Sequence, residues 1–142
     1  MKLVDKENKI LKTVCDEHIL SEHSETLAYD MIVTMKEHDA IGLAAPQVGE
    51  NTALMIIGHE DTGFVVCINP VWEVAEDSED EDFLEGCVSF PGLELTINRP
   101  NKINGTFTDL KGMRKTSTFF GVWAQAFQHE CDHLNGITFD TL

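Results

Sequence analysis

The stretch "QHECDHLNG" at residues 128–136 carries two histidines, His129 and His133, four positions apart, with Glu130 directly after the first. On an α-helix, positions i and i+4 lie on the same face about one turn apart, so both imidazoles can reach one metal ion. Glu130 is rotated away by one residue and can reach a metal-bound water rather than the metal. This H-E-x-x-H pattern is typical of metal-assisted hydrolysis. The alternative is a pair of histidines that only makes ordinary core or surface contacts.

Two helices are expected around this motif and near the start of the chain. The helix that carries the histidines is predicted from about residue 122 to 135, and Gly136 is well placed to end it. An earlier helix is predicted over residues 24–38, because apolar side chains recur there at i, i+4 and i+8. These side chains are Leu27, Met31 and Met35.

Strands are expected between the two helices. "TALMIIG" (52–58) and "GFVVCINP" (63–70) are apolar runs of strand length, bounded by Gly, Asn and Pro. "LELTINRP" (93–100) alternates apolar and polar residues, and residues 102–120 predict a hairpin around 110–112. The class is therefore α+β, with an N-terminal helix and antiparallel or mixed strands surrounding a central metal-binding helix.

The composition indicates one globular domain over residues 1–142. The chain has 25 acidic and 10 basic side chains, a formal charge of −15, which argues against nucleic acid or an anionic membrane as a direct partner. The run "EDSEDED" (76–82) holds six of these acids and is expected to be a solvated loop.

The location expected from the sequence is the cytoplasm. No apolar stretch approaches the roughly 18 residues of a membrane span, and the first residues lack the apolar segment of a secretory signal. The four cysteines show no C-x-x-C pair and no dense spacing, so they are expected to be thiols in a reducing compartment.

A catalytic metal site of this kind needs a third protein ligand and an open position for water. The nine residues after His133 contain no histidine or glutamate, so this ligand is expected upstream. Cys87 in "EGCVSFPG" (85–92) is the candidate, because a thiolate with two imidazoles suits Fe²⁺, Zn²⁺, Ni²⁺ or Co²⁺. A lone cysteine is otherwise often a small buried apolar residue. Cys131 projects to the opposite side of the helix and is rejected as a ligand.

Three stretches together resemble the signature motifs of peptide deformylases. They are "IGLAAPQVG" (41–49), "EGCVSFPG" and "QHECDHLNG", in the right order and with plausible spacing. The resemblance implies a metal-dependent hydrolase that removes the formyl group from the N-terminal formyl-methionine of newly made polypeptides. It makes Cys87, His129 and His133 the ligands of one divalent ion, natively Fe²⁺, with Zn²⁺, Ni²⁺ or Co²⁺ as substitutes.

The same resemblance implies roles for the residues around the metal. Glu130 becomes the general base and proton shuttle. Gln47, through its side-chain amide, and Val88, through its backbone N–H, become donors to the oxyanion. Asp132 is expected to orient a ligand or cap the helix, and Glu85 and Arg99 resemble an ion pair that braces the cysteine strand. The residues expected to bind substrate are Ile41, Gly42, Phe83, Gly86, Val122 and Ala126.

Some positions depart from the family pattern. Glu94 falls where many relatives carry a basic residue near the substrate entrance, and Trp123 and Gln125 lie where relatives place smaller or aliphatic residues. Many bacterial relatives continue with a long C-terminal helix that helps them dock on the ribosome, so the short form resembles phage-encoded deformylases.

The partners expected are formyl-methionyl nascent peptides, with a weakened ribosome contact, in the cytoplasm of a bacterial host and with the protein as a monomer. Two other functions stay open. One is an H-E-x-x-H metallopeptidase. The other is a non-catalytic metal-binding module, against which Glu130 argues because a closed structural site has no use for a base.

Overall fold

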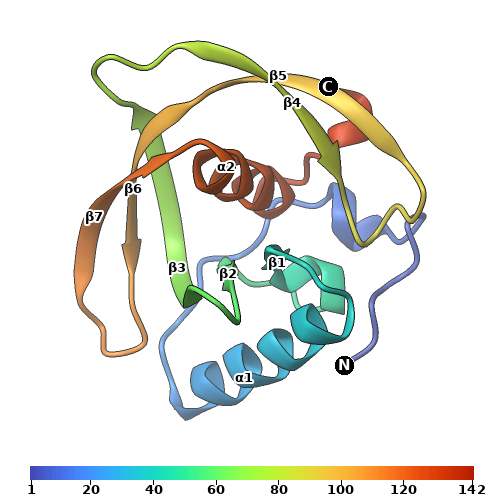
Figure 1. Ribbon diagram of the computed structural model, residues 1–142. Coiled ribbons are helices and arrows are strands. Elements are labelled where there is room, and N and C mark those ends of the chain that lie inside the picture. The colour runs from blue at the N-terminus through green and yellow to red at the C-terminus, as the bar shows by residue number, and fades with distance from the viewer.

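Helix α2 (Val122–Leu134) lies in the middle of the molecule, with strands on more than one side of it (Figure 1). The computed structural model describes residues 1–142. A five-stranded antiparallel sheet has the order β1-β2-β3-β6-β7, and β4 and β5 form a separate two-stranded sheet. The strands are β1 Gly42–Ala44, β2 Leu54–His59, β3 Gly63–Val74, β4 Asp80–Gly86, β5 Glu94–Pro100, β6 Lys102–Thr108 and β7 Arg114–Phe120. The expected α+β class, with a central histidine-bearing helix, is confirmed.

Strand β2 is buried on both faces, which explains its unbroken apolar sequence. Leu54 and Ile56 pack into one apolar cluster with helix α1 (Glu22–Glu37). Met55 and Ile57 pack into a second cluster with α2. A strand covered on both faces reads as a continuous apolar run rather than as an alternating one. The sheet therefore separates α1 from the helix that carries the histidines.

The predicted N-terminal helix is confirmed, with its first residue two positions earlier than expected. Ser21 caps the helix by accepting a hydrogen bond from the backbone N–H of His23, and Ser24 completes a capping box. The predicted apolar stripe of Leu27, Met31 and Met35 is buried. Helix α1 ends just before the segment that leads into β1, so it fixes where the glycine-rich stretch at residue 42 begins.

Helix α2 packs closely on the sheet through Phe127, which is fully buried. A Cβ atom at Gly105 of β6 would lie 2.6 Å from Cζ of Phe127, so only a glycine lets the ring approach the strand. The helix ends as predicted, because Gly136 adopts a left-handed φ of 72° just after the C-cap Asn135. This packing holds the histidine-bearing face of α2 toward β4 and β5.

The acidic run was predicted to be a loop throughout, and this is wrong for its last part. Residues 80–82 are the first residues of β4 and pair with Pro100, Arg99 and Asn98 of β5. Their side chains are exposed, as expected, and Asp82 accepts a hydrogen bond of 2.9 Å from Asn98. Acids are tolerated here because the hairpin has a solvated end, and the pairing partner on β5 supplies the strand geometry that the acids themselves do not favour.

Strand β3 also differs from expectation, since it continues past Pro70 to Val74. A register shift between Ile68 and Val71 takes up the irregularity, and Asn69 there adopts a φ of 50°.

None of the helices combines the length and the hydrophobicity that crossing a bilayer requires.

Candidate metal centre and active site

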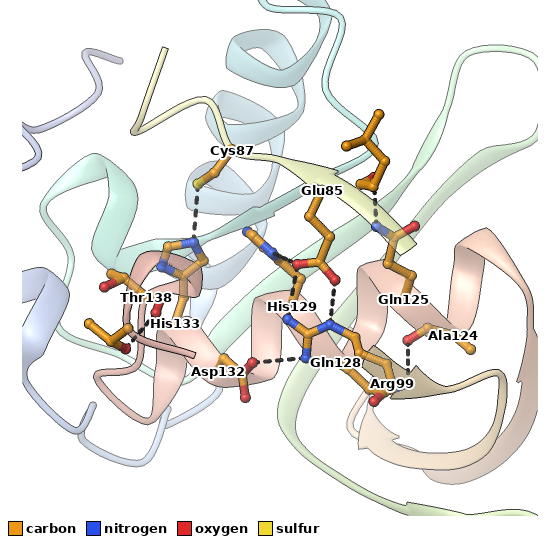
Figure 2. A network of polar contacts seen from close by, with 12 residues as sticks. Glu85, Cys87, Arg99, Ala124, Gln125, Gln128, His129, Asp132, His133 and Thr138 are labelled. Atoms are coloured by element: carbon orange, nitrogen blue, oxygen red, sulfur yellow. Dashed lines mark hydrogen bonds and ion pairs between the residues drawn. The ribbon is translucent and has the colours of Figure 1, made fainter. Parts of the chain in front are cut away.

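Cys87, His129 and His133 come together at the junction of β4 and α2. Cys87 follows directly after the last residue of β4, and both histidines lie on one face of α2 (Figure 2). One ligand atom from each of the three residues lies within 4.8 Å of the others, and Sγ of Cys87 is 3.4 Å from Nε2 of His133. Cys131 is turned away, with its sulfur 3.8 Å from that of Met55 in the core. The three predicted ligand residues are therefore the ones that converge.

A network of charged side chains orients His129 from the side of its ring that faces away from Cys87 and His133 (Figure 2). Its Nδ1 lies 2.9 Å from Oε1 of Glu85, which leaves Nε2 directed toward Cys87 and His133. Arg99 binds Glu85 with two nitrogens, through Nε and through Nη2 at 3.0 Å, and its Nη1 donates to Asp132 at 3.0 Å. This arrangement contains the expected Glu85–Arg99 ion pair, while Asp132 contacts Arg99 rather than a ligand, so the orienting role expected for it stays a prediction. A carboxylate behind a metal-ligating imidazole fixes its tautomer and its ring orientation.

The charge state of Glu85 supports this orienting role. Burial alone would raise the pKa of this carboxyl, but hydrogen bonds from His129 and Arg99, with the charge of Arg99, outweigh it and hold the pKa at about 2. Glu85 is therefore an anion over the whole physiological range, and it favours the tautomer of His129 with a proton on Nδ1.

Glu130 lies beside the ligands with an unsatisfied carboxylate. Only 5% of its surface is exposed, and its Oε1 has no hydrogen-bond partner. Burial raises the pKa of Glu130 to about 7, with the charge of Glu85 adding to the rise and His129 opposing it. Nδ1 of His133 is likewise buried without a partner. Buried polar atoms almost always have partners, so the unpaired Oε1 of Glu130 favours a bound group beside it, whereas His133 meets Cys87 through Nε2 and its Nδ1 does not bear on this site. A sulfur and two imidazole nitrogens are a donor set that fits one divalent transition-metal ion.

Gly42 of β1 touches the Glu130 side chain. A Cβ atom at position 42 would lie 3.0 Å from Cδ of Glu130 and would overlap its Oε2. The backbone of Gly42 is not in the left-handed region, so the requirement for glycine is one of space alone. Gly42 therefore sets the position of the Glu130 carboxylate from the opposite side of the cavity.

Gly42→Ala is expected to lower turnover by roughly 10²-fold, the scale of a misplacement of about 1 Å in a reacting group. Metal content should stay unchanged, because none of the three ligands contacts the new methyl group. The measurement is turnover kinetics together with metal analysis. A double-mutant cycle with Glu130→Ala provides the control. If the methyl acts through Glu130, it should add little in the Glu130→Ala background, whereas equal losses in both backgrounds would contradict this.

Gln47 and Val88 present N–H groups to the same region. The side chain of Gln47 is fixed, because its Oε1 accepts the backbone N–H of Ala44 at 2.9 Å. Its Nε2 lies 3.0 Å from Oγ of Ser89 and 3.5 Å from Sγ of Cys87. The backbone N–H of Val88 donates to no backbone acceptor. The N–H of Val88 is thus available to a negatively charged oxygen next to Cys87, whereas the Gln47 amide would have to exchange one of its present acceptors, Ser89 or Cys87, for that oxygen.

These groups open into a cavity of about 380 Å³. It is bounded by the segment before β1, by the end of β4 and by the first turns of α2, and Gly42, Gln47, Val88 and Glu130 all reach it. Of the residues expected to bind substrate, the structure places Ile41, Gly42, Gly86, Val122 and Ala126 on its wall.

Phe83 was expected on this wall and is not there. It is buried, with 8% of its surface exposed, while its neighbour Leu84 lines the cavity. Phe83 lies on the buried face of β4, which also carries Glu85, while Leu84 projects from the exposed face at the rim of the cavity. His38 and Asp39, which were not among the predicted site residues, follow α1 and also line the cavity. A polar pair at a helix end gives no periodic signal that would have marked it.

A buried glutamate beside a Cys-His-His ligand set, at the wall of an open cavity, defines a metal-dependent hydrolase. The polypeptide deformylase family model matches residues 1–141. The chain therefore belongs to the polypeptide deformylase family, and its activity is the hydrolytic removal of the N-formyl group from nascent polypeptides. This resolves the two alternatives in favour of deformylation.

Individual relatives agree with this membership. The peptide deformylase of Dictyoglomus thermophilum is 42% identical over 118 residues, covering 83% of this chain and 75% of the relative. The crystal structure of a peptide deformylase from Synechococcus elongatus in complex with actinonin superimposes with a TM-score of 0.91 at 34% identity, covering 97% of this chain and 75% of that one. A probable peptide deformylase from Synechococcus phage S-SSM7 gives 0.89 at 32% identity, covering 99% and 97%.

Proposed function

We propose that Cys87, His129 and His133 hold one divalent metal ion, natively Fe²⁺, with Zn²⁺, Ni²⁺ or Co²⁺ as substitutes. The observation that carries this proposal is the approach of their three ligand atoms to within 4.8 Å of one another. When bound, the ion makes a water acidic enough to attack near neutral pH and polarises the formyl carbonyl. The Glu85 carboxylate holds His129 in the orientation that this ligand set needs.

Glu130 acts as the general base and then as the general acid. Its carboxylate takes a proton from the attacking water and passes it to the amine that leaves when the formyl C–N bond breaks. Support comes from its burial and from its unpaired Oε1, which lies beside the ligand atoms and is free to accept a proton.

Gln47 and Val88 stabilise the charge that develops on the formyl oxygen. The Nε2 of Gln47 and the backbone N–H of Val88 both lie beside Cys87, and both reach the cavity. Donors that are fixed before the reaction cost no reorganisation when the oxyanion forms. The hydrogen bond from Ala44 to Gln47 supplies this rigidity for the side-chain amide.

The substrate is an N-formyl-methionyl peptide. The methionine side chain occupies the cavity against the apolar wall of Ile41, Val122 and Ala126. The peptide backbone runs along Gly42 and Gly86, and at Gly86 the lack of a side chain leaves room for it, since a Cβ atom there would come no closer than 3.9 Å to a neighbour. Strand β1 lies at the end of the sheet order, so one of its edges is free to pair with an added strand.

The assay that tests this proposal is deformylation of formyl-Met-Ala with and without a chelator. Activity should be lost when the metal is removed and should return when Fe²⁺, Ni²⁺ or Co²⁺ is added. Thermal stability should fall with the metal, because metal binding and folding are linked. Unblocked Met-Ala serves as the control and should not be cleaved. Full activity in a metal-free sample would refute the assignment.

The iron form is expected to lose activity in air faster than the nickel form. The reason is a cysteine ligand next to a redox-active ion, open to oxidation. Both forms are prepared from the same stripped protein, and residual deformylation is followed over time in air and under argon. Equal decay of the two forms in air would contradict the proposal that iron chemistry limits the lifetime of this site.

We further propose a monomeric enzyme of the bacterial cytoplasm that acts on nascent chains and contacts the ribosome weakly. The formal charge of −15 supports the weak contact, because it disfavours binding to RNA. A phage origin is also part of this proposal, in line with the similarity to the chain from Synechococcus phage S-SSM7, and a bacterial deformylase from Acinetobacter baumannii is covered to the same 97%.

A further inference from the structure

The mouth of the active-site cavity is acidic on one side, at the end of α1. Asp39 lines the cavity with 89% of its side chain exposed. The histidine next to it, His59, is shared between Asp39 at 3.1 Å and Asp61 at 3.6 Å, and Glu60 is paired with Lys36 at 3.7 Å. The carboxylates of Asp39, Glu60 and Asp61 thus outnumber the positive partners next to them, Lys36 and His59. The net charge beside this part of the mouth is therefore negative.

The other side of the mouth is acidic as well. Glu94 of β5 pairs directly with Gly86 of β4, and directly paired residues project from the same face of a sheet. Gly86 lines the cavity and has no side chain, and a Cβ atom placed there would come no closer than 3.9 Å to any neighbour. The exposed Glu94 therefore lies directly beside a residue that forms the edge of the cavity.

No lysine or arginine lines the cavity to offset these charges. A peptide with its formyl-methionine in the cavity must leave through this mouth, past Asp39 or Glu94. We infer that the enzyme selects formyl-methionyl chains in which lysine or arginine occurs within the first few residues after methionine. The inference rests on the proposed function, because it assigns the sequence preference of that same site.

The selection is expected to act on binding rather than on the chemical step. The charged residues of the substrate lie beyond the reacting bond. Exposed charges mainly speed association and stabilise the enzyme–substrate complex. Kcat/KM should therefore change through KM, with kcat almost unaffected. The effect should also fade with salt, because the Debye length shrinks from about 8 Å at 0.15 M to about 3 Å at 1 M.

The test compares formyl-Met-Ala-Lys, formyl-Met-Ala-Gln and formyl-Met-Ala-Glu, each with an amidated C-terminus, on the metal-loaded enzyme. We expect kcat/KM to fall in that order, with about a 5-fold span or more between the first and last at low salt, and the span to collapse near 1 M salt. Glu94→Lys and Asp39→Asn should each narrow the span.

Glu25→Lys is the control, because Glu25 is exposed in the first turn of α1, about 18 Å along the helix from its last residue. It makes the same change in net charge as Glu94→Lys and should leave the span unchanged. Equal kcat/KM for the three peptides, or an equal response of the two lysine variants, would overturn the inference. If the metal-loaded parent enzyme does not deformylate formyl-Met-Ala itself, the proposed function is refuted instead.

Discussion

Glu130→Ala is expected to keep about one bound metal ion per chain and to lose at least ~10²-fold in turnover, the usual scale for a lost general acid–base group. None of the three converging ligand atoms belongs to Glu130. Its carboxylate is buried beside them with an unpaired oxygen, so the variant removes a proton carrier and leaves the ligands in place. Metal analysis and a deformylation assay on one preparation measure both quantities.

The same variant separates three roles for this residue. A base gives retained metal and lost turnover, a ligand gives parallel loss of both, and a structural side chain leaves both nearly intact. Substrate affinity should change little, since Ile41, Val122 and Ala126 form the apolar wall. The variant should also be at least as stable as the parent protein, because a buried and partly unpaired carboxyl is costly to keep in the folded state. A marked loss of stability would contradict the view that Glu130 is retained for chemistry.

Cys87→Ser is expected to lower metal affinity by more than 10²-fold, and with it the activity. A hydroxyl is a poor replacement for a thiolate on a soft or borderline ion, and even residues behind the ligands typically contribute 10- to 100-fold. Titration of the stripped variant with Ni²⁺ or Co²⁺, followed by deformylation at saturating metal, measures the two effects separately.

Cys131→Ser is the matched control, since it makes the same chemical change at the cysteine that lies inside the histidine motif. Cys131 is buried against Met55 and lies outside the ligand cluster, so its metal affinity should be nearly that of the parent protein. Its stability should fall by about 1–3 kcal/mol, because a hydroxyl would be buried in an apolar environment. The reverse pattern of metal affinities would show that the wrong sulfur has been assigned.

The sequence was sufficient to predict an element or a site wherever a single local physical rule determines it. The stripe of Leu27, Met31 and Met35 specified α1, and the His129–His133 spacing specified the face of α2 that bears the ligands. It was insufficient where a distant partner made the decision. Residues 80–82 are poor strand formers that extend only because β5 pairs with them.

The cavity wall shows the same limit. Phe83 shares the face of β4 that carries Glu85 and turns toward α2, so it is buried, whereas Leu84 lies on the exposed face at the rim of the cavity. His38 and Asp39 reach the cavity because of where α1 ends in space. That position results from the packing of α1 on the sheet, and no local sequence pattern marks it. The metal ligands were recognisable because the ion requires particular atoms, whereas a pocket wall requires only a shape.

The separate β4–β5 hairpin gives the site its own cooperative unit. Its strands hydrogen-bond to each other and not to the larger sheet, and a two-stranded hairpin is marginal by itself. It is held to α2 by polar contacts of Glu85 and Arg99, and to the C-terminal segment by a small apolar cluster that includes Ile97 and Phe139. Such a segment opens at a lower free energy than the core, as a foldon does. Each opening would carry Cys87 away from the histidines, so the working lifetime of the enzyme is expected to follow this one hairpin rather than global unfolding.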